Sequence, residues 1–499
     1  MRPLLQRHGL ELALCAACCC ATLLLDGGRA RTELLWGDEI VSVRAIQQDF
    51  EGLIQHRYWQ GHSPLYFIFL KLWVLVTSGV DGLARPGEYL LRLPSLILMG
   101  LAGGLLAATA WRAWGVAAGM LLLALWLGNN LVERYAVEAR PYAMLLFFLA
   151  AAMWSSTRLW LANEDDRSIA MGAVAVCSRI LAAATIPVGV IAVLAMEACS
   201  FRIRGANAYN RFWRYRSFAV LAAMIVIVAV YAPAIAAKSD GYWVETHAPL
   251  SWKSLGSVVH RIFLNGASRL DTWPFASLGG AVMAGMAVYG LSINRHELPA
   301  RLAAGLAFVG TAILIVMSAF NSLMLPRYFI TAVPGVLLLA VSAASGKTGR
   351  GNRMAVLALA CSAVLMLAGD RNRLNRPNTF QNHLTLITSL QPGEITGSAT
   401  DYNLLSSLKF YLPARTGYRV NARYRKQPMS VDDLPEDSKL HWLFSTLGPE
   451  AERTMVAGVP VLCRYSLQDG AVFVIGSSRA ALPASMRDCP PYDGLKKMP

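Results

Sequence analysis

The chain has 499 residues, of which 55% are hydrophobic and 15% are charged, and its mean hydropathy is +0.42. Soluble globular proteins carry about 25% charged residues, so this composition excludes an ordinary soluble protein and indicates an integral membrane protein. The net charge of +15 does not indicate nucleic-acid binding, because many basic residues stand in short clusters between apolar runs, as in the cytoplasmic loops of membrane proteins.

The first apolar segment runs from about Gly9 to Leu25 and follows two basic residues, Arg2 and Arg7. Its length is compatible with a signal peptide, but the further apolar runs favour an uncleaved first span. In both cases the residues that follow emerge on the far side of the membrane, so the choice does not change the topology.

The later apolar runs predict the remaining spans, since a crossing helix needs about 20 apolar residues. The run 64–80 is apolar but short and carries Lys71, so we predict an amphipathic or re-entrant helix on the outer surface. Pro187 favours a break between two of the runs. The candidate spans lie near 88–110, 114–131, 142–161, 168–182, 184–200, 217–237, 274–293, 300–320, 329–345 and 354–369.

The positive-inside rule sets the orientation. The stretch FRIRGANAYNRFWRYR holds five arginines between Arg202 and Arg216, and we assign it to the cytoplasm. In the preferred topology 64–80 does not cross the membrane and 168–200 crosses twice. The reverse pair of choices also keeps the arginine-rich stretch inside, but it places the acidic segments discussed below on opposite sides of the membrane. The sequence therefore predicts a polytopic α-helical membrane protein of about eleven spans, with the amino terminus inside. Its transmembrane domain covers 1–369 and includes a large first outer loop, 26–87.

Residues 370–499 are more polar and follow the last span, so we predict an extracytoplasmic α/β domain. Short apolar stretches in LITSLQPGEITGS, SKLHWLFST, GVPVLCRYSL and AVFVIGS are typical of strands. Cys463 and Cys489 lie in this domain, and they can form a disulfide if it faces an oxidising compartment.

Several ionisable residues fall on the predicted outer face. Asp38 and Glu39 stand in LLWGDEIVSV, directly after the first span, and His62 precedes the surface helix in GHSPLYF. The remaining candidates are Glu138 and Arg140 in VEARPY, Arg179 inside an apolar run, and Arg327 with Tyr328 in LPRYF.

Each candidate also has a structural explanation. Glu138 and its neighbours can form local ion pairs at helix spacing, Arg327 and Tyr328 can anchor the interface, and His62 can cap a turn. Arg179 is harder to explain in this way, because a charge inside a span is costly and usually faces a cavity or a partner. Taken together, outer carboxylates and arginines indicate a site for an anionic lipid headgroup and an acceptor hydroxyl. The carboxylate would take the proton, and the cations would hold the phosphate leaving group.

The motifs WGDE, HSPLYFIFLKLW, LRLPS, EARPYAMLLF and PRYFITAVPGVLLLA occur in the order seen in GT-C glycosyltransferases. Over roughly residues 30–345, the chain resembles the bacterial protein-mannosyltransferase-like and lipid A aminoarabinose transferase-like membrane enzymes. The resemblance implies transfer of a sugar from a polyprenyl-phosphate carrier to a lipid, glycan or protein acceptor. It also implies a multi-pass protein of the inner (plasma) membrane with its active site on the extracytoplasmic face.

By this resemblance Asp38 would be the catalytic base, with Glu39 beside it and Glu138 as a second acid. His62, Arg140, Arg179, Arg327 and Tyr328 would bind the substrate, although Ser63 replaces a proline of the family motif next to His62. No cofactor is certain from the sequence, and a divalent metal stays open because no ligand spacing requires one. A transporter or flippase is the competing interpretation, but it would more often show matched repeats or paired broken helices. A non-catalytic envelope protein that recognises glycans is a third.

Overall fold

The computed structural model describes residues 2–84, 86–162, 169–200, 208–237, 250–264, 275–321, 323–345 and 349–368, and, from the last part of the chain, 386, 394–399, 410–411, 419–424, 441–445, 461–467 and 470–475. The chain divides into two compact units. The membrane unit comprises Met1–Arg31 and Ala45–Asn375, and the sheet unit comprises Thr32–Arg44 and Arg376–Pro499.

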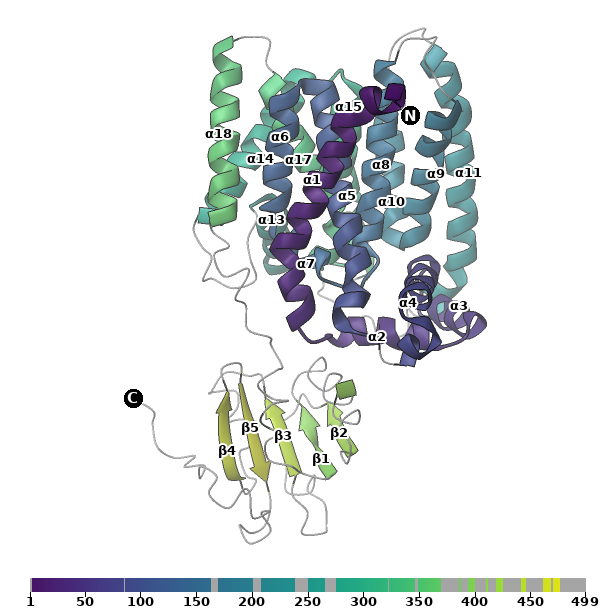
Figure 1. Cartoon of the computed structure of the whole chain (residues 1–499), viewed down its shortest axis with the longest axis vertical. Helices are drawn as coiled ribbons and strands as arrows, with labels where there is room; N and C mark the ends of the chain where they lie inside the picture. Colours follow the sequence, from purple (N-terminus) through teal and green to yellow (C-terminus); the bar gives the residue numbers. More distant parts are fainter. Residues whose placement is uncertain are drawn as a thin grey trace. The chain divides into compact units, whose positions relative to one another are not determined.

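Helices make up nearly all of the described part of the membrane unit (Figure 1). In chain order the helices are α1 (Arg2–Thr32), α2 (Gly37–Gln47), α3 (Phe50–Trp59), α4 (Leu65–Ala84), α5 (Glu88–Trp114), α6 (Val116–Leu127), α7 (Asn130–Ala136), α8 (Tyr142–Leu161), α9 (Ile169–Thr185), α10 (Pro187–Ser200), α11 (Ala208–Ala237), α13 (Trp252–Phe263), α14 (Phe275–Asn294), α15 (Leu298–Ala304), the π-helical η3 (Gly305–Gly310), α16 (Thr311–Asn321), the 3-10 helix η4 (Pro326–Phe329), α17 (Ala332–Ser342), the 3-10 helix η5 (Ala343–Ser345) and α18 (Gly349–Ala368).

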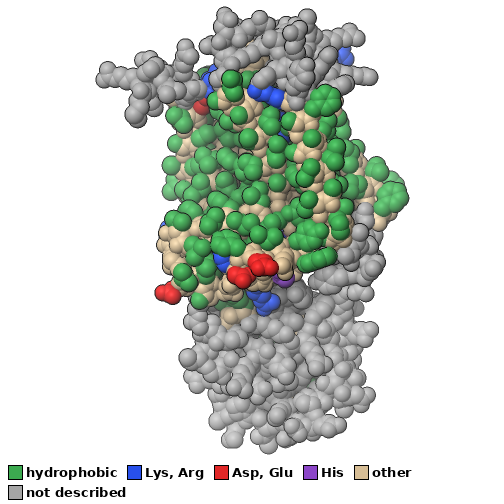
Figure 2. Space-filling view, turned by 90° about the vertical axis from the view of Figure 1, so that its right-hand side faces the viewer, with side chains coloured by type: hydrophobic (Ala, Val, Ile, Leu, Met, Phe, Trp, Pro, Cys, Tyr) green, Lys and Arg blue, Asp and Glu red, His purple; other side chains and the backbone are tan. Residues whose placement is uncertain are grey.

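Most of the long helices run side by side. Within the described residues, seven helices are long and apolar enough to cross a bilayer, and α6 with α7, bent by 64°, adds an eighth if the two form one broken span. Shorter apolar helices include α9, α10 and α17. Figure 2 shows hydrophobic side chains covering the visible side of this bundle in a broad band, as a bilayer requires. The number of about eleven spans stays a prediction.

Helix α4 contains the run predicted to lie on the surface. By length and composition it qualifies as a span. Figure 1 nevertheless shows it nearly end-on at the lower end of the bundle, where α1, α5 and α8 are seen along their length. Its surface position stays a prediction, and the orientation across the other helices supports it.

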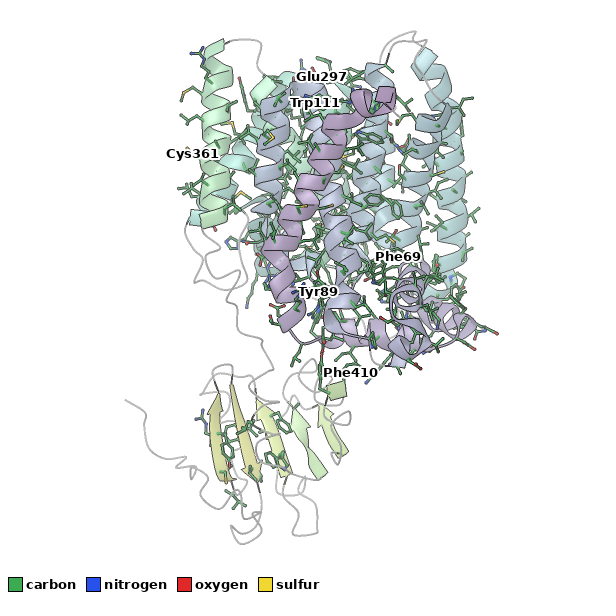
Figure 3. All side chains as sticks on the ribbon, in the orientation of Figure 1. Phe69, Tyr89, Trp111, Glu297, Cys361 and Phe410 are labelled. Atoms are coloured by element: carbon green, nitrogen blue, oxygen red, sulfur yellow. The ribbon has the colours of Figure 1, made fainter. Side chains whose placement is uncertain are left out.

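Side-chain contacts define the two ends of the bundle. Glu11 of α1 forms ion pairs with Arg112 of α5 and Arg158 of α8, and at the start of α15 Glu297 accepts a hydrogen bond of 2.7 Å from Trp114 Nε1. Figure 3 shows Trp111 and Glu297 at the same end, and Tyr89 at the other. The basic residues Arg112, Arg295 and Arg301 lie near these positions in the sequence, as the positive-inside rule expects of a cytoplasmic end. We call this the Glu297 end, and the opposite one the Tyr89 end.

Helices α1 and α5 approach closely because glycines face cysteines. A Cβ atom at Gly100 would lie 2.6 Å from Cys19 Cα, and one at Gly104 would lie 2.4 Å from Cys15 Cα. Real Cβ atoms do not approach other atoms this closely, so a larger residue at either position would force the helices apart. Glycine at this spacing therefore permits the tight packing of α1 against α5. The thiols of Cys15, Cys18 and Cys19 therefore lie in or beside a helix interface.

Arg179 of α9 is fully buried and joins three helices. Its Nε donates to Glu197 Oε1 of α10 at 2.6 Å, and its Nη2 donates to Ser156 Oγ of α8 at 3.0 Å. Its Nη1 donates to the carbonyl of Ala175 at 2.8 Å. Glu197 also accepts a hydrogen bond from Ser217 of α11. Helices α9 and α10 meet at Pro187, where the sequence predicted a break.

The sheet unit holds five strands in the order β2-β1-β3-β5-β4. They are β1 (Glu394–Ala399), β2 (Arg419–Tyr424), β3 (His441–Ser445), β4 (Val461–Leu467) and β5 (Gly470–Ile475). The first three strands are parallel, and β5 pairs antiparallel with β3 and β4. Four of the strands lie in the predicted stretches. The sequence did not predict β2, because its residues, RVNARY, are mostly polar.

Trp442, Phe444 and Val474 are buried in the described part of this sheet. Cys463 of β4 is disulfide-bonded, as the sequence allows for a domain in an oxidising compartment. Cys489, its predicted partner, lies outside the described residues.

We expect the buried pair Arg179–Glu197 to contribute mainly to stability. Removing one partner strands the other charge inside the bundle and costs about 3–5 kcal/mol, whereas replacing both by apolar residues is close to neutral. Arg179→Met and Glu197→Met should therefore each lower the melting temperature of the purified protein, and the double variant should recover much of the loss. A single variant as stable as the wild type would remove this role.

The distribution of basic residues gives a topology prediction. Reporter fusions at residue 208 should indicate the cytoplasm, and fusions after residue 375 should indicate the opposite side, because the five arginines from Arg202 to Arg216 stay inside. A fusion at Gly82 should agree with that at 375 if α4 lies on the surface. A cytoplasmic result at Gly82 would mean that α4 crosses.

Candidate active site

The α3–α4 corner carries the motif RYWQGHSPL. Helix α3 ends at Trp59, and two residues later Gly61 has a φ of 66°, which suits glycine. The amide of His62 donates to the carbonyl of Arg57 at 2.9 Å, and that of Gly61 donates to Tyr58 at 2.8 Å. These two bonds form a Schellman motif, so the backbone itself holds His62 next to the last turn of α3. His62 is half-buried.

Ser63 and Lys71 fix the start of α4. The Ser63 hydroxyl donates to the carbonyl of Ala184 on α9, and it accepts a hydrogen bond from the amide of Leu65 at 3.3 Å. The Lys71 ammonium donates to the carbonyl of Ile46 at 2.8 Å and to that of Gln48, which satisfies the end of α2. Lys71 is therefore a structural residue that joins α4 to the α2–α3 turn.

Helix α7 and the turn after it supply buried charges. Asn129 caps α7 by accepting hydrogen bonds from Leu131 and Val132. In the helix, Glu133 forms an ion pair with Arg29 of α1. The next residue, Arg134, donates through its Nε to Oε1 of Glu138, which lies four residues further along the chain, at 3.2 Å.

The next basic residues come from η4 and α13. Arg327 lies with its guanidinium carbon 5.4 Å from the centre of the Tyr328 ring. The charge of Arg134 interacts with that of Arg327 and with that of Arg261 in α13. Burial, and then the charge of Arg134, lower the pKa of Arg261. Arginines from α7, η4 and α13 therefore interact through their charges, and Arg134 of α7 bonds directly to Glu138.

Arg57 and Arg140 form a second basic group. Arg57 is fully buried in α3, and its guanidinium carbon lies 4.7 Å from the centre of the Phe67 ring. Arg140, in the turn before α8, is also buried. Burial first, and then the charge of Arg140, lower the pKa of Arg57 to about 10. Two cations that repel each other away from water are suited to an anionic ligand.

The two acids of the opening motif begin α2, in the sheet unit. Glu39 is fully buried, and its Oε2 accepts a hydrogen bond of 3.3 Å from the amide of Trp36 at the helix N-cap. This is one half of a capping box. Asp38 is half-buried in the first turn, and the Ser42 hydroxyl donates to its backbone carbonyl. In the same segment the Leu35 amide donates to the Tyr411 hydroxyl at 2.7 Å.

The structure brings several of the predicted site residues together in the membrane unit. Arg134 bonds to Glu138 and interacts with Arg327. Arg140, two residues after Glu138, interacts with Arg57, which the backbone joins to His62. These residues belong to the Tyr89 end, because Glu133 bonds to the end of α1 opposite Glu11.

Arg179 belongs to the interhelical network instead, and Asp38 and Glu39 group with the sheet unit. The sequence did not single out Arg57 or Arg261. The nearby aromatic residues in HRYWQGHSP were the available signal for Arg57.

Among the residues that the structure describes, no group of three or more His, Cys, Asp or Glu side chains could hold a metal ion. The described acids of the membrane unit's site are instead engaged with arginines.

A comparison with protein-family models gives no match, and neither does one with curated protein sequences. Comparison with solved structures does find matches. ArnT from Cupriavidus metallidurans in the apo state aligns with a TM-score of 0.54 at 12% identity, over 94% of this chain and 98% of ArnT. The same ArnT bound to undecaprenyl phosphate aligns with a TM-score of 0.52.

The archaeal oligosaccharyltransferase AglB from Archaeoglobus fulgidus, in complex with an inhibitory peptide and a dolichol-phosphate, aligns with a TM-score of 0.54 at 11% identity. The alignment covers 96% of this chain and 75% of AglB. The predicted fold resemblance is therefore confirmed: the chain has the fold of the GT-C membrane glycosyltransferases.

Proposed function

We propose that this protein is a membrane glycosyltransferase that transfers a sugar from a polyprenyl-phosphate-linked donor to an acceptor of the cell envelope. One observation carries the proposal: nearly the whole chain shares its fold with an ArnT structure that holds undecaprenyl phosphate. The buried arginines at the Tyr89 end support it, because a phosphate leaving group needs positive charge around it. The reaction takes place on the extracytoplasmic side of the inner membrane.

In the proposed reaction, the hydroxyl oxygen of the acceptor attacks the anomeric carbon of the sugar. The bond from that carbon to the phosphate oxygen breaks, and its electron pair leaves with the polyprenyl phosphate. The arginines offset the negative charge that develops on the phosphate. The proton of the acceptor hydroxyl passes to a carboxylate, which we assign to Asp38.

Glu39 has a different role in this proposal. Its carboxylate holds the first turn of α2 through the Trp36 amide, so it fixes the backbone that carries Asp38. Gln can accept the same hydrogen bond. Glu39 is therefore a positioning residue, and its charge matters less than its acceptor oxygen.

The disulfide-bonded Cys463 supports the proposed location of the sheet unit, since disulfides persist in oxidising compartments such as the periplasm. AglB was solved with an inhibitory peptide and a dolichol-phosphate. A peptide acceptor is thus one candidate for this chain, besides a lipid or a glycan. Another Archaeoglobus oligosaccharyltransferase structure contains zinc. The mechanism above needs no metal in any of its steps.

A lipid-linked-glycan flippase is the second candidate, because it would also hold a lipid phosphate among arginines. The two functions differ in one bond, since a flippase leaves the sugar–phosphate linkage intact. Mass spectrometry of envelope glycans and glycolipids, with and without the protein, identifies the modification that depends on it. Release of polyprenyl phosphate by the purified protein, together with a modified acceptor, supports transfer, and movement of the intact donor without this release supports transport.

Asp38→Asn should remove most sugar transfer while the protein still accumulates and binds the donor. Asn has nearly the same shape but cannot take a proton, and general-base catalysis contributes typically ~10²–10⁴-fold. The matched control is the neighbouring Glu39→Gln, which keeps the helix cap and should lose far less. The assay is transfer in membranes supplied with the donor, at equal protein levels. Near-normal transfer by Asp38→Asn would contradict the assignment of the base.

Glu138 and Arg134 should act as one unit. Because their side chains are bonded at helix spacing, removing the second partner should add little once the first is lost. We expect Glu138→Gln and Arg134→Gln each to raise the KM for the donor, and the double variant to resemble the worse single one. Fully additive losses would mean that the two residues work separately.

A further inference from the structure

The last turn of α1 is joined to two other helices of the membrane unit. Arg29 is buried, and its guanidinium donates a hydrogen bond to Oε1 of Glu133 in α7, which is also buried. The carbonyl of the next residue, Ala30, accepts a hydrogen bond of 3.2 Å from Nη1 of Arg92 in α5. The last carbonyls of a helix have no partner within the helix, so Arg92 satisfies one of them. Helix α1 thus ends against both α5 and α7.

The local sequence makes this turn a weak piece of helix. Gly27 and Gly28 precede it, and glycine is less favourable inside a helix than any residue except proline. Packing does not require glycine here, because a Cβ atom at either position would meet no atom within 4 Å outside the helix backbone. Arg31 adds a further contact, with its guanidinium carbon 4.6 Å from the centre of the Tyr89 ring. Contacts with neighbouring helices therefore hold the end of α1 in place.

The partner of Arg29 belongs to the helix that carries part of the candidate site. Glu133 directly precedes Arg134, which bonds to Glu138. Helix α7 has seven residues and follows α6 after a bend of 64°. A helix this short is not stable in water by itself, so contacts with its neighbours set its orientation. The buried ion pair with Arg29 is a contact of this kind.

The ion pair with α1 also determines where Arg134 points. Neighbouring side chains of an α-helix are about 100° apart around its axis, so fixing the direction of Glu133 fixes that of Arg134 as well. Glu133 points to α1, and Arg134 points to Glu138 in the turn after α7. A displacement of a site residue by about 1 Å can lower a reaction rate about a hundredfold. The contact between α1 and α7 can therefore control the site without touching the substrate.

We propose that Arg29 is a positioning residue for the transfer reaction and that it acts on Arg134 and Glu138 through Glu133. The inference rests on the proposed function and extends it to α1, whose sequence is also compatible with a removable signal peptide. In this proposal α1 stays attached, because its last turn holds the helix that carries Arg134.

The other end of α1 offers a matched control. Glu11 is buried and accepts hydrogen bonds from Arg112, Trp154 and Arg158 at the Glu297 end. It joins α1 to neighbouring helices through charge, as Arg29 does, but it lies roughly 27 Å away along the helix. If the ion pairs of α1 are only structural, substitutions at the two ends will have the same effects.

The test measures the affinity of the purified protein for undecaprenyl phosphate in lipid nanodiscs, together with the melting temperature of each variant. Arg29→Gln and Glu11→Gln should both lower the melting temperature, because each leaves a buried charge without its partner. Arg29→Gln should also bind undecaprenyl phosphate about tenfold more weakly, a coupling of the size found within one ion-pair network. Glu11→Gln should stay within about twofold of the wild type, as expected for a distant site.

A double-variant comparison shows whether Arg29 acts through Arg134. In a protein that already carries Arg134→Gln, adding Arg29→Gln should weaken binding little further, because the group that it positions is gone. Arg29→Lys keeps the charge but not the planar fork, so it should bind with intermediate affinity. This variant replaces Arg29→Gln in the comparison if the latter does not accumulate.

Three results would overturn the inference. Arg29→Gln could bind undecaprenyl phosphate as well as Glu11→Gln does, its effect could add fully to that of Arg134→Gln, or the mature protein could begin after Arg31. The intact mass of the purified protein decides the last point, and we expect it to include α1. If the wild type binds no undecaprenyl phosphate, the proposed function fails too. If the wild type binds it and Arg29→Gln binds it equally, only the role of Arg29 fails.

Discussion

A charge that is taken away from water must find a partner inside the protein, and this requirement organises the membrane unit. Lipid offers no hydrogen bonds, so ionisable side chains of the bundle turn inward or gather at its ends. Glu11 joins Arg112 and Arg158 at one end, and Arg179 joins Glu197 between the helices. At the Tyr89 end Arg57 and Arg140 are both buried, and burial and then the charge of Arg140 lower the pKa of Arg57.

These buried arginines connect the fold with the proposed chemistry. A glycosyltransferase of this kind must stabilise a phosphate that leaves with an extra negative charge, and it must do so at the membrane surface. Fixed arginines in a buried corner supply that stabilisation without reorganising during the reaction.

The sequence predicted the elements whose signal is local. Apolar runs gave the helices, Pro187 gave the break between α9 and α10, and apolar stretches gave β1, β3, β4 and β5. It did not predict β2, because the residues of this strand, RVNARY, include no apolar run. The partner of Arg179 was also hidden, since Glu197 lies 18 residues away in another helix. Arg57 was not singled out from the sequence, although it is completely buried in α3 and Phe67 of α4 contacts its guanidinium.

The central claim is that the sugar–phosphate bond breaks on this protein. The most direct measurement reconstitutes the purified protein in liposomes with a polyprenyl-phosphate donor labelled in its sugar, adds candidate acceptors, and quantifies both free polyprenyl phosphate and labelled acceptor. The account predicts that the two products appear in equal amounts and only when protein and acceptor are both present. Movement of intact donor across the membrane, with no polyprenyl phosphate released in the presence of an acceptor that is modified in cells, would contradict it.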